Sequence, residues 1–190
     1  MMIKKKPLRR GVLGALVATL GLTAGVRAQG LFDKPITHSV ARGDVDAVRR
    51  DLLKGVNPNQ TDERQTPLLI AAVAKGHLAV VELLLKAGAV VDGVDADQRT
   101  ALMWAAERDD VDAAQLLLAR NPRVNLQDRQ GVTALIAASR RGSAEIVRAL
   151  LARKANPNIA DFTGRTALNY AVRDNRHAIA SLLRAAGARS

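Results

Sequence analysis

The sequence contains no cysteine and very few aromatic residues, which make up only 2% of its 190 residues. Without cysteine the chain can form no disulfide, carry no lipid on a cysteine and use no cysteine nucleophile. Hydrophobic residues nevertheless make up 48% of the chain, so its core has to be aliphatic. Side chains such as Leu, Val and Ala suit helices that pack closely against similar helices.

Acidic residues are missing from the first 28 positions, which hold six basic side chains. A basic segment, residues 4–10, precedes an uncharged stretch from Gly11 to Val26, and small residues stand at the end of Val26-Arg27-Ala28. This three-part pattern predicts a bacterial signal peptide over residues 1–28, cleaved near Ala28. The mature chain is then expected in the periplasm or in the medium.

Two alternatives for this leader stay open. The uncharged stretch is short for a membrane span and contains four glycines, but an uncleaved N-terminal anchor would have the same layout. The segment Arg9-Arg10-Gly11-Val12-Leu13 resembles a twin-arginine export signal, although Leu8 stands where Ser or Thr is usual. Export by the general secretory route and export by the twin-arginine route are both compatible with the sequence.

The net charge of +11 is distributed unevenly along the chain. Six of the 29 basic residues belong to the leader. Residues 29–119 carry ten basic and 14 acidic side chains, whereas residues 120–190 carry 13 basic and four acidic ones. The overall charge therefore overstates the argument for nucleic acid binding, and the basic excess of the mature chain lies in its C-terminal half.

Beyond the leader, the sequence repeats every 33 residues. The recurring positions are Gly43, Gly76, Asp109, Gly142 and Asn175; Asn59, Asp92, Asn125 and Asn158; Asp62, Asp95, Asp128 and Asp161; and Leu52, Leu85, Leu118 and Leu151. A fixed period of this length indicates a repeat array in which each unit buries its apolar faces against its neighbours. The predicted domain covers residues 29–190, with units at about 29–61, 62–94, 95–127, 128–160 and 161–190.

Each unit is predicted to contain two short helices and a polar turn. A threonine is expected to cap the first helix, and Pro67 follows the first of these residues. The four threonines are Thr66, Thr100, Thr133 and Thr166. The second helix ends at a glycine in most units, but Lys154 stands at that position in the fourth, which predicts a local weakness of about 1 kcal/mol.

The segments TPLLIAA, TALMWAA, TALIAAS and TALNYAV, together with KGHLAVVELLLKAGA, resemble the ankyrin repeat. The resemblance implies an all-α solenoid of five stacked helix-turn-helix units with short β-hairpin-like loops. The end units depart from the pattern. Polar Thr37, His38 and Ser39 of the first unit are expected to form an outward-facing cap, and Arg184 replaces the recurring leucine in the last unit.

No residue pattern in the chain indicates catalysis, a metal site or a cofactor. The three histidines, His38, His77 and His177, lie in different units, and stacked helices are roughly 10 Å apart. The strict period of the recurring aspartates favours a turn-forming role over a catalytic one. The sequence therefore predicts a protein that is not an enzyme and has no small-molecule substrate.

Ankyrin-repeat proteins bind partners with their hairpin tips and their concave face, so the resemblance implies where this chain binds. The predicted partner-binding residues are Arg99, Arg108, Arg129, Gln130, Arg140, Arg141, Phe162, Arg165 and Arg173. Five of these arginines are expected to crowd the groove side of the fourth and fifth units with little acid nearby, which favours a partner with an acidic surface. They are Arg129, Arg140, Arg141, Arg165 and Arg173. Phe162 is either an exposed anchor or packed onto its own hairpin. Trp104 and Tyr170 are expected to be partly packed.

These observations predict a periplasmic protein-protein interaction module, acting as scaffold, inhibitor or companion of another exported protein. The alternative is a binder of an anionic polymer or membrane surface through the basic C-terminal half. Single-stranded nucleic acid is disfavoured because no aromatic platform is interleaved with the arginines. Apart from that alternative, membrane attachment is expected only through an uncleaved leader.

Overall fold

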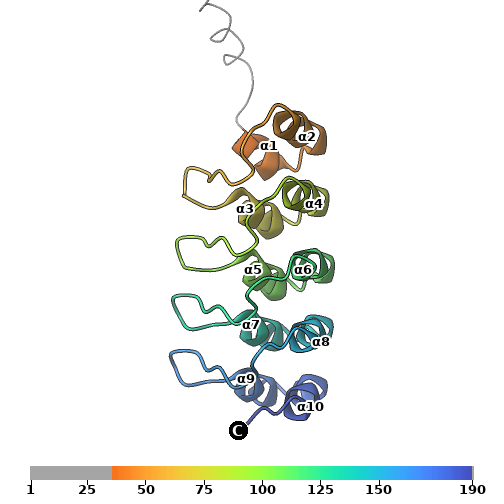
Figure 1. Cartoon of the computed structure of the whole chain (residues 1–190). Coiled ribbons are helices and arrows are strands. Elements are labelled where there is room, and N and C mark those ends of the chain that lie inside the picture. Colours follow the sequence, from red (N-terminus) through yellow and green to blue (C-terminus); the bar gives the residue numbers. More distant parts are fainter. Residues whose placement is uncertain (1–35, 190) are drawn as a thin grey trace, which may run out of the picture. The chain divides into compact units, whose positions relative to one another are not determined.

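The computed structural model describes residues 36–189, so the predicted leader lies outside the described residues. Ten helices follow one another in this range, and only isolated bridges of extended backbone accompany them (Figure 1). The helices are α1 (Ile36–Arg42), α2 (Val45–Leu53), α3 (Leu68–Lys75), α4 (Leu78–Lys86), α5 (Ala101–Arg108), α6 (Val111–Leu118), α7 (Ala134–Arg141), α8 (Ala144–Ala152), α9 (Ala167–Arg173) and α10 (His177–Ala185). The predicted all-α repeat architecture is confirmed.

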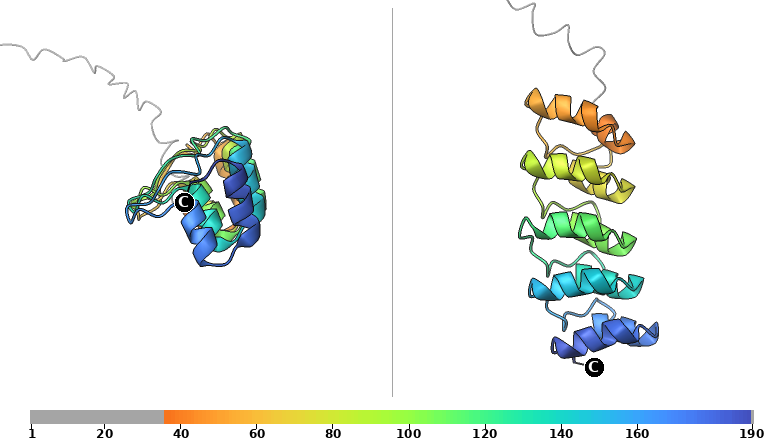
Figure 2. Two further views of the ribbon diagram at one scale, coloured as in Figure 1. Left: turned by 90° about the horizontal axis from the view of Figure 1, so that it is seen from below. Right: turned by 90° about the vertical axis from the view of Figure 1, so that its right-hand side faces the viewer.

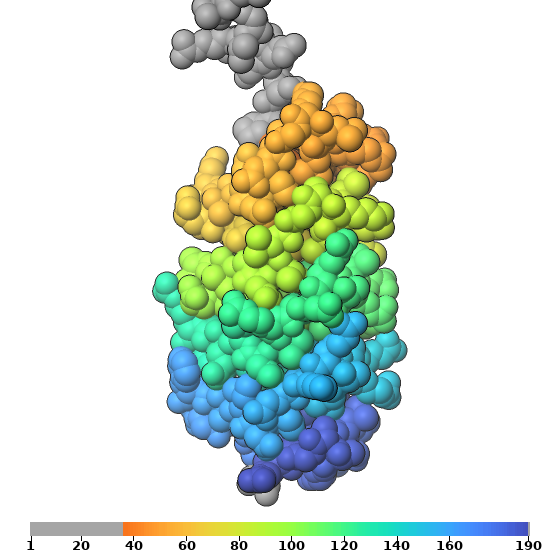
Figure 3. Space-filling view, viewed as in Figure 1, coloured from red at the N-terminus to blue at the C-terminus, as the bar shows by residue number. Residues whose placement is uncertain are grey.

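The helices pack as pairs, and each pair stacks on the next. The odd-numbered helices α1 to α9 contact one another in order, and the even-numbered helices α2 to α10 do the same, so two parallel rows of helices result (Figure 2). The hairpin loops that join successive pairs project on one side of these rows (Figure 1). In the space-filling view, successive units follow one another as adjoining bands (Figure 3).

Small and branched aliphatic side chains fill the interfaces between units. Alanine recurs in the middle of the first helices, and leucine recurs in the second helices. Ala72, Ala105, Ala138 and Ala171 are fully buried, as are Leu84, Leu117, Leu150 and Leu183. Burial of each leucine contributes roughly 1.5–3 kcal/mol. Because the first helices of successive units contact one another, as do the second helices, the stability of the array depends on stacking.

The outward cap predicted for the first unit is only partly correct. His38 is exposed and Thr37 is half-buried, but Ser39 is buried, with 6% of its surface exposed. Ser39 stands 33 residues before Ala72 and occupies the same interior position, where a small side chain fits. In the last unit Arg184 is exposed, as expected of a position that no further described helix pair covers.

Threonine caps three of the first helices. The side-chain oxygens of Thr100, Thr133 and Thr166 accept the backbone N–H three residues later, at 3.2–3.3 Å. The prediction for Thr66 is wrong, because Pro67 is the cap residue of α3 and no side-chain hydrogen bond caps that helix. The second unit keeps the 33-residue register, so Thr66 corresponds to Arg99 and Pro67 to Thr100.

The recurring aspartates form the hairpin turns, as predicted. In each case one carboxylate oxygen accepts two backbone N–H groups, from the residues two and four positions later, at 2.8–3.1 Å. The residues are Asp62, Asp95, Asp128 and Asp161. Each carboxylate thus replaces backbone partners that the tight turn cannot supply.

A second recurring set joins successive units. The side-chain oxygens of Asn59, Asp92, Asn125 and Asn158 accept the backbone N–H groups of Val90, Arg123, Asn156 and Arg189, at 2.7–3.0 Å. Each bond spans 31 residues, from one unit to the turn that follows the next second helix. The sequence shows that these positions recur, whereas only the structure shows that they bridge neighbouring units.

Two of the recurring glycines lie close to side chains of the following unit. Gly43 and Gly142 follow the first helices with positive φ angles of 71° and 97°. A Cβ atom on Gly43 would lie 2.6 Å from the His77 ring, and one on Gly142 would lie 2.7 Å from the Arg176 guanidinium. His77 and Arg176 both belong to the following unit. The positive φ angle favours glycine at both positions, and the His77 ring adds a steric reason at Gly43, whereas the flexible Arg176 side chain can move away from position 142.

Candidate functional site

The hairpins of the third, fourth and fifth units are joined at their tips. The backbone N–H of Arg129 donates to the carbonyl oxygen of Asp97 at 3.0 Å, and that of Phe162 donates to the carbonyl oxygen of Gln130 at 2.9 Å. These bonds run from each hairpin to the preceding one. The three tips therefore form a continuous ridge beside the row of first helices.

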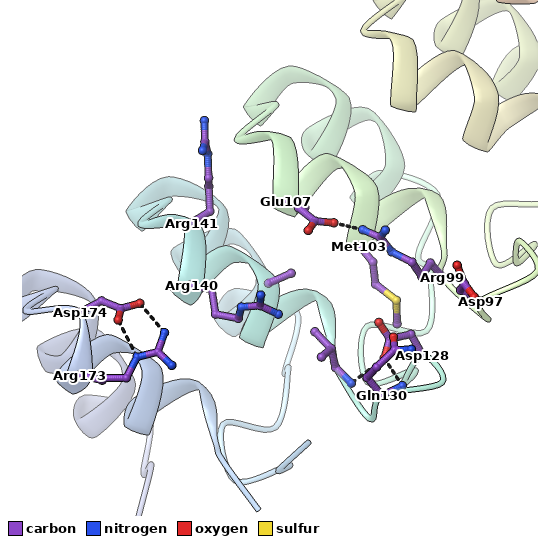
Figure 4. Close-up of a pocket in the computed structure, with 12 residues that line it drawn as sticks. Asp97, Arg99, Met103, Glu107, Asp128, Gln130, Arg140, Arg141, Arg173 and Asp174 are labelled. Carbon is purple, nitrogen blue, oxygen red and sulfur yellow. Dashed lines mark hydrogen bonds and ion pairs between the residues drawn. The ribbon is translucent and has the colours of Figure 1, made fainter. Parts of the chain in front are cut away.

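A hollow of about 480 Å³ lies between this ridge and helices α5, α7 and α9 (Figure 4). Most of the side chains that line it are charged. The basic ones are Arg99, Arg140, Arg141 and Arg173, and the acidic ones are Asp97, Glu107, Asp128 and Asp174. Gln130, Met103, Val132 and Ala137 complete the lining. The hollow is thus built by three successive units.

The structure brings together five of the nine predicted partner-binding residues in this hollow. They are Arg99, Gln130, Arg140, Arg141 and Arg173. The other four, Arg108, Arg129, Phe162 and Arg165, are exposed but do not line it. Phe162 has 73% of its surface exposed, and its ring lies against Gly131 of the preceding hairpin. It is therefore an exposed side chain rather than one packed onto its own hairpin.

The expectation of a groove with little acid nearby is wrong. Four carboxylates line the hollow together with its four guanidinium groups. Asp97 and Glu107 come from the third unit, which stacks directly onto the basic fourth unit. A charge count over residues 120–190 does not include Asp97 and Glu107, although stacking places them beside the arginines of the fourth unit.

At the third unit, an arginine is held between an acid and an aromatic ring. Arg99 forms an ion pair with Glu107, and its guanidinium lies 3.9 Å from the centre of the Trp104 ring. The ring is itself fixed, because its Nε1–H donates to Asp95 Oδ2 at 2.8 Å. Trp104 is half-buried, so the prediction of partial packing is correct. Arg99 is thereby held in place by contacts within its own unit.

The fifth unit uses a tyrosine in the same way. The Tyr170 hydroxyl donates to Asp161 Oδ2 at 2.6 Å, and the ring is 7% exposed. The guanidinium groups of Arg173 and Arg140 lie 4.8 Å and 5.5 Å from the ring centre, within range of a cation–π interaction. Tyr170 thus supports arginines from two neighbouring units.

Hydrogen bonds set the ionisation of two carboxyl groups here. Burial opposes ionisation of Asp161, but bonds from Thr163, from Tyr170 and from two backbone N–H groups outweigh it, and the pKa of Asp161 falls to about 2. The pKa of Asp174 is lowered mainly by the Arg173 guanidinium, which donates to both of its oxygens, at 2.7 and 3.2 Å. Both carboxylates are therefore charged at neutral pH.

Arg140 and Arg141 differ from the other arginines of the hollow. Arg99 and Arg173 are paired with carboxylates, whereas neither Arg140 nor Arg141 has a carboxylate partner among residues 36–189. Figure 4 shows Arg140 directed toward the hairpin that carries Gln130, and Arg141 extending away from it. These two exposed guanidinium groups are free to donate hydrogen bonds to another molecule.

Within the described range, no group of three or more histidine, aspartate or glutamate side chains could hold a metal ion. None of the ten described helices is long and apolar enough to cross a membrane. The features that stand out in this range are the hollow and the ridge of hairpin tips.

Comparison with known protein families agrees with this architecture. A family model that consists of three ankyrin repeats matches the chain twice, over residues 36–128 and over residues 115–189. The chain belongs to the ankyrin-repeat family. A search of curated protein sequences gives no match for it. Ankyrin repeats generally mediate protein-protein interaction, and proteins of this family are typically interaction modules without enzymatic activity.

The sequence of this ankyrin array carries a signal for two of the acids that line the hollow. Glu107, Arg140 and Arg173 are separated by 33 residues, so they occupy one position in successive units. Arg108, Arg141 and Asp174 form a second such row. When equivalent positions of successive units are compared, Glu107 stands at the start of the first row and Asp174 at the end of the second.

Proposed function

We propose that the mature chain is a periplasmic protein-binding module that acts as scaffold, inhibitor or companion of another exported protein. The observation that carries this proposal is the charged hollow, with its two unpaired guanidinium groups on α7. A partner segment that places carboxylates against Arg140 and Arg141 would satisfy both. Since the other arginines of the hollow are already paired, the partner needs an acidic site at this point rather than an acidic surface throughout.

The character of the hollow supports a protein partner over a small molecule. Small-molecule sites are mostly apolar and enclose their ligand, whereas charged side chains dominate this lining and only Met103, Val132 and Ala137 add apolar surface. Arginine and exposed aromatic residues are frequent anchors of protein interfaces. Phe162 extends the same surface along the ridge of hairpin tips, and no catalytic role for the chain is proposed.

The periplasmic location rests on the predicted signal peptide of residues 1–28. A reporter that is active only after export, fused after Gln29, tests it directly. We expect reporter activity with the leader and none without it, and N-terminal sequencing of the exported chain should begin near Gln29. Replacing Arg9 and Arg10 by lysine separates the two export routes, because the twin-arginine route requires the arginine pair. An inactive fusion would place the protein elsewhere.

Crosslinking in intact cells, followed by identification of the captured proteins, tests the binding surface. The variant Arg140→Ala/Arg141→Ala should lose a partner that the wild type captures, while it keeps its fold, because both side chains are exposed and only the contact of Arg140 with the Tyr170 ring is removed. Arg42→Ala/Arg50→Ala removes the same charge from exposed positions in the first unit and should retain capture. Equal capture by both variants would show that the hollow is not the binding site.

The ridge is tested separately with Phe162→Ala/Arg165→Ala. Both side chains are exposed, so the fold should again be unaffected. Loss of capture here as well as in the α7 variant would show that the partner contacts the hollow and the hairpin tips together. Capture that survives this change would confine the interface to the hollow.

A further inference from the structure

The basic excess of the C-terminal half does not lie in the hollow, where four acids face four arginines. Five of the 13 basic residues of positions 120–190 lie instead in the turns that follow the last three second helices, residues 119–125, 153–158 and 186–189. These turns carry five exposed cations and no acidic residue. We call this surface the basic edge, and its cations are Arg120, Arg123, Arg153, Lys154 and Arg189.

The three turns form one continuous surface. The backbone N–H of Asn156 donates to Asn125 Oδ1 and that of Arg189 to Asn158 Oδ1, each at 2.8 Å. Each turn is thereby bonded to the next, and stacked units place equivalent residues roughly 10 Å apart. The cations therefore follow the stacking axis in a narrow row over three units.

Two of these cations interact with other residues of the array through their side chains, and three do not. Arg123 pairs with Asp92, at 3.3 Å, and the Arg153 guanidinium donates to the Leu118 carbonyl and to Asn121 Oδ1. Arg120, Lys154 and Arg189 have no side-chain partner within residues 36–189. Because nothing in the described array neutralises them, these three charges are available to a ligand.

Lys154 is also held in an unfavourable conformation. Its φ angle is 61°, in the left-handed region, where asparagine stands at the equivalent position 121 and glycine at positions 55, 88 and 187. A lysine here costs stability that a glycine would not. The unpaired charge of Lys154 is therefore carried by a residue whose backbone conformation costs stability.

We propose that the basic edge binds a linear acidic polysaccharide. A narrow row of cations matches the charge of an extended polyanion. A membrane surface fits less well, because interfacial binding also needs apolar anchors and none of the exposed large hydrophobic side chains of the described range belongs to these turns. Nucleic acid fits less well because the turns contain no aromatic residue on which bases could stack.

Binding of a fluorescent heparin oligosaccharide to the full-length chain tests the proposal. The triple variant Arg120→Gln/Lys154→Gln/Arg189→Gln removes the three unpaired charges. Its control, Arg42→Gln/Lys75→Gln/Arg50→Gln, removes two arginines and one lysine from exposed positions elsewhere. All chains share the same leader, so its basic residues cancel in the comparison. We expect affinity to fall on the order of tenfold or more in the edge variant only, together with a shallower salt dependence.

Three outcomes would overturn the proposal: no binding by the wild type at low salt, equal losses in the edge variant and its control, or tighter edge-dependent binding of phosphatidylglycerol vesicles or single-stranded DNA than of heparin. The inference does not rest on the protein-binding hollow. Partner capture depends on Arg140 and Arg141, which the edge variant keeps, so failure of one proposal leaves the other testable.

Discussion

The hollow and the basic edge are built by the same three units, yet they treat charge in opposite ways. In the hollow, Glu107 pairs with Arg99 and Asp174 with Arg173. At the edge, Arg120, Lys154 and Arg189 have no side-chain partner among the described residues. A periodic backbone thus presents two rows of side chains that vary independently, because neither row is needed to bury the core.

The two surfaces also differ in how firmly their side chains are held. Trp104 and Tyr170 fix arginines of the hollow through ring contacts, and each aromatic ring is anchored by an aspartate of its hairpin. The edge has no aromatic residue in its turns. A preorganised surface suits a partner of defined shape, whereas a series of cations without ring contacts suits a ligand whose charges are evenly repeated.

The largest expected effect is a loss of stability when the stacking of units, on which both surfaces depend, is weakened. Leu117 is fully buried in the third unit, so Leu117→Ala should lower the free energy of unfolding by about 2–5 kcal/mol. Leu53→Ala is the matched control, because Leu53 is 82% exposed and should change stability by less than about 0.5 kcal/mol. Urea denaturation measures both. Similar losses in the two variants would contradict the assignment of Leu117 to the core.

The next effect depends on pH and concerns Asp161, which holds the Tyr170 ring that contacts two arginines of the hollow. The pKa of Asp161 is lowered from 3.8 to about 2 on folding, so its ionisation contributes about 2 kcal/mol of stability above pH 4. Most of this contribution is lost as the pH falls from about 4 to 2, because over this range the carboxyl group is protonated in the unfolded chain while it is still largely ionised in the folded one. Asp161→Asn should therefore lose less stability than the wild type over this range.

Denaturation curves at pH 6 and pH 2.5 measure that difference. Asp97→Asn serves as control, since the Asp97 carboxylate accepts no hydrogen bond in the described array. Tyr170→Phe should retain part of the effect, because it removes one of the four bonds that favour the charged form. If Asp161→Asn and Asp97→Asn respond alike to acid, the hydrogen bonds of Asp161 are not what lowers its pKa.

A smaller effect is expected when Lys154 of the basic edge is replaced by glycine. Lys154→Gly should raise stability by about 1 kcal/mol, because glycine adopts the left-handed conformation without steric cost. The same change should weaken heparin binding, so stability and binding should move in opposite directions. Arg120→Gly, at a residue without a positive φ angle, should weaken binding with no gain in stability. A Lys154→Gly variant that binds heparin as tightly as the wild type would show that the strain serves no ligand.

The smallest effect is expected for the ion pair between Arg99 and Glu107. The two side chains are 21% and 52% exposed, and solvent weakens such a pair. A double-mutant cycle with alanine at both positions should give a coupling energy below about 1 kcal/mol. A much larger coupling would mean that the pair holds the hollow in shape rather than merely neutralising it.

The fold was predictable from the sequence because the repeat period exposes it. The recurring leucines and alanines mark the buried faces, and the recurring aspartates mark the turns. Two predictions were wrong because they followed a local sequence feature instead of the 33-residue repeat. Thr66 looked like a helix cap because Pro67 follows it, and Ser39 looked like surface because it is polar. In both cases the 33-residue register indicates the correct position.

The candidate site was predictable only in part, and which of its residues bind a partner stays a prediction. The first-helix positions that line the hollow follow from the repeat pattern, as Arg140 and Arg173 show. Which charges neutralise one another does not, because pairing depends on side chains of neighbouring units that stacking brings together. The ring contacts of Trp104 and Tyr170 have the same origin.

By itself the sequence determined the helices, their pairing into units and the interior of the array, since these depend on residues that recur at a fixed interval. Only the tertiary structure decided where charge is satisfied and where it is left unpaired. The physical reason is that electrostatic interactions act across space: Asp92 meets Arg123 and Arg140 meets Tyr170 because units stack, not because they are near in sequence.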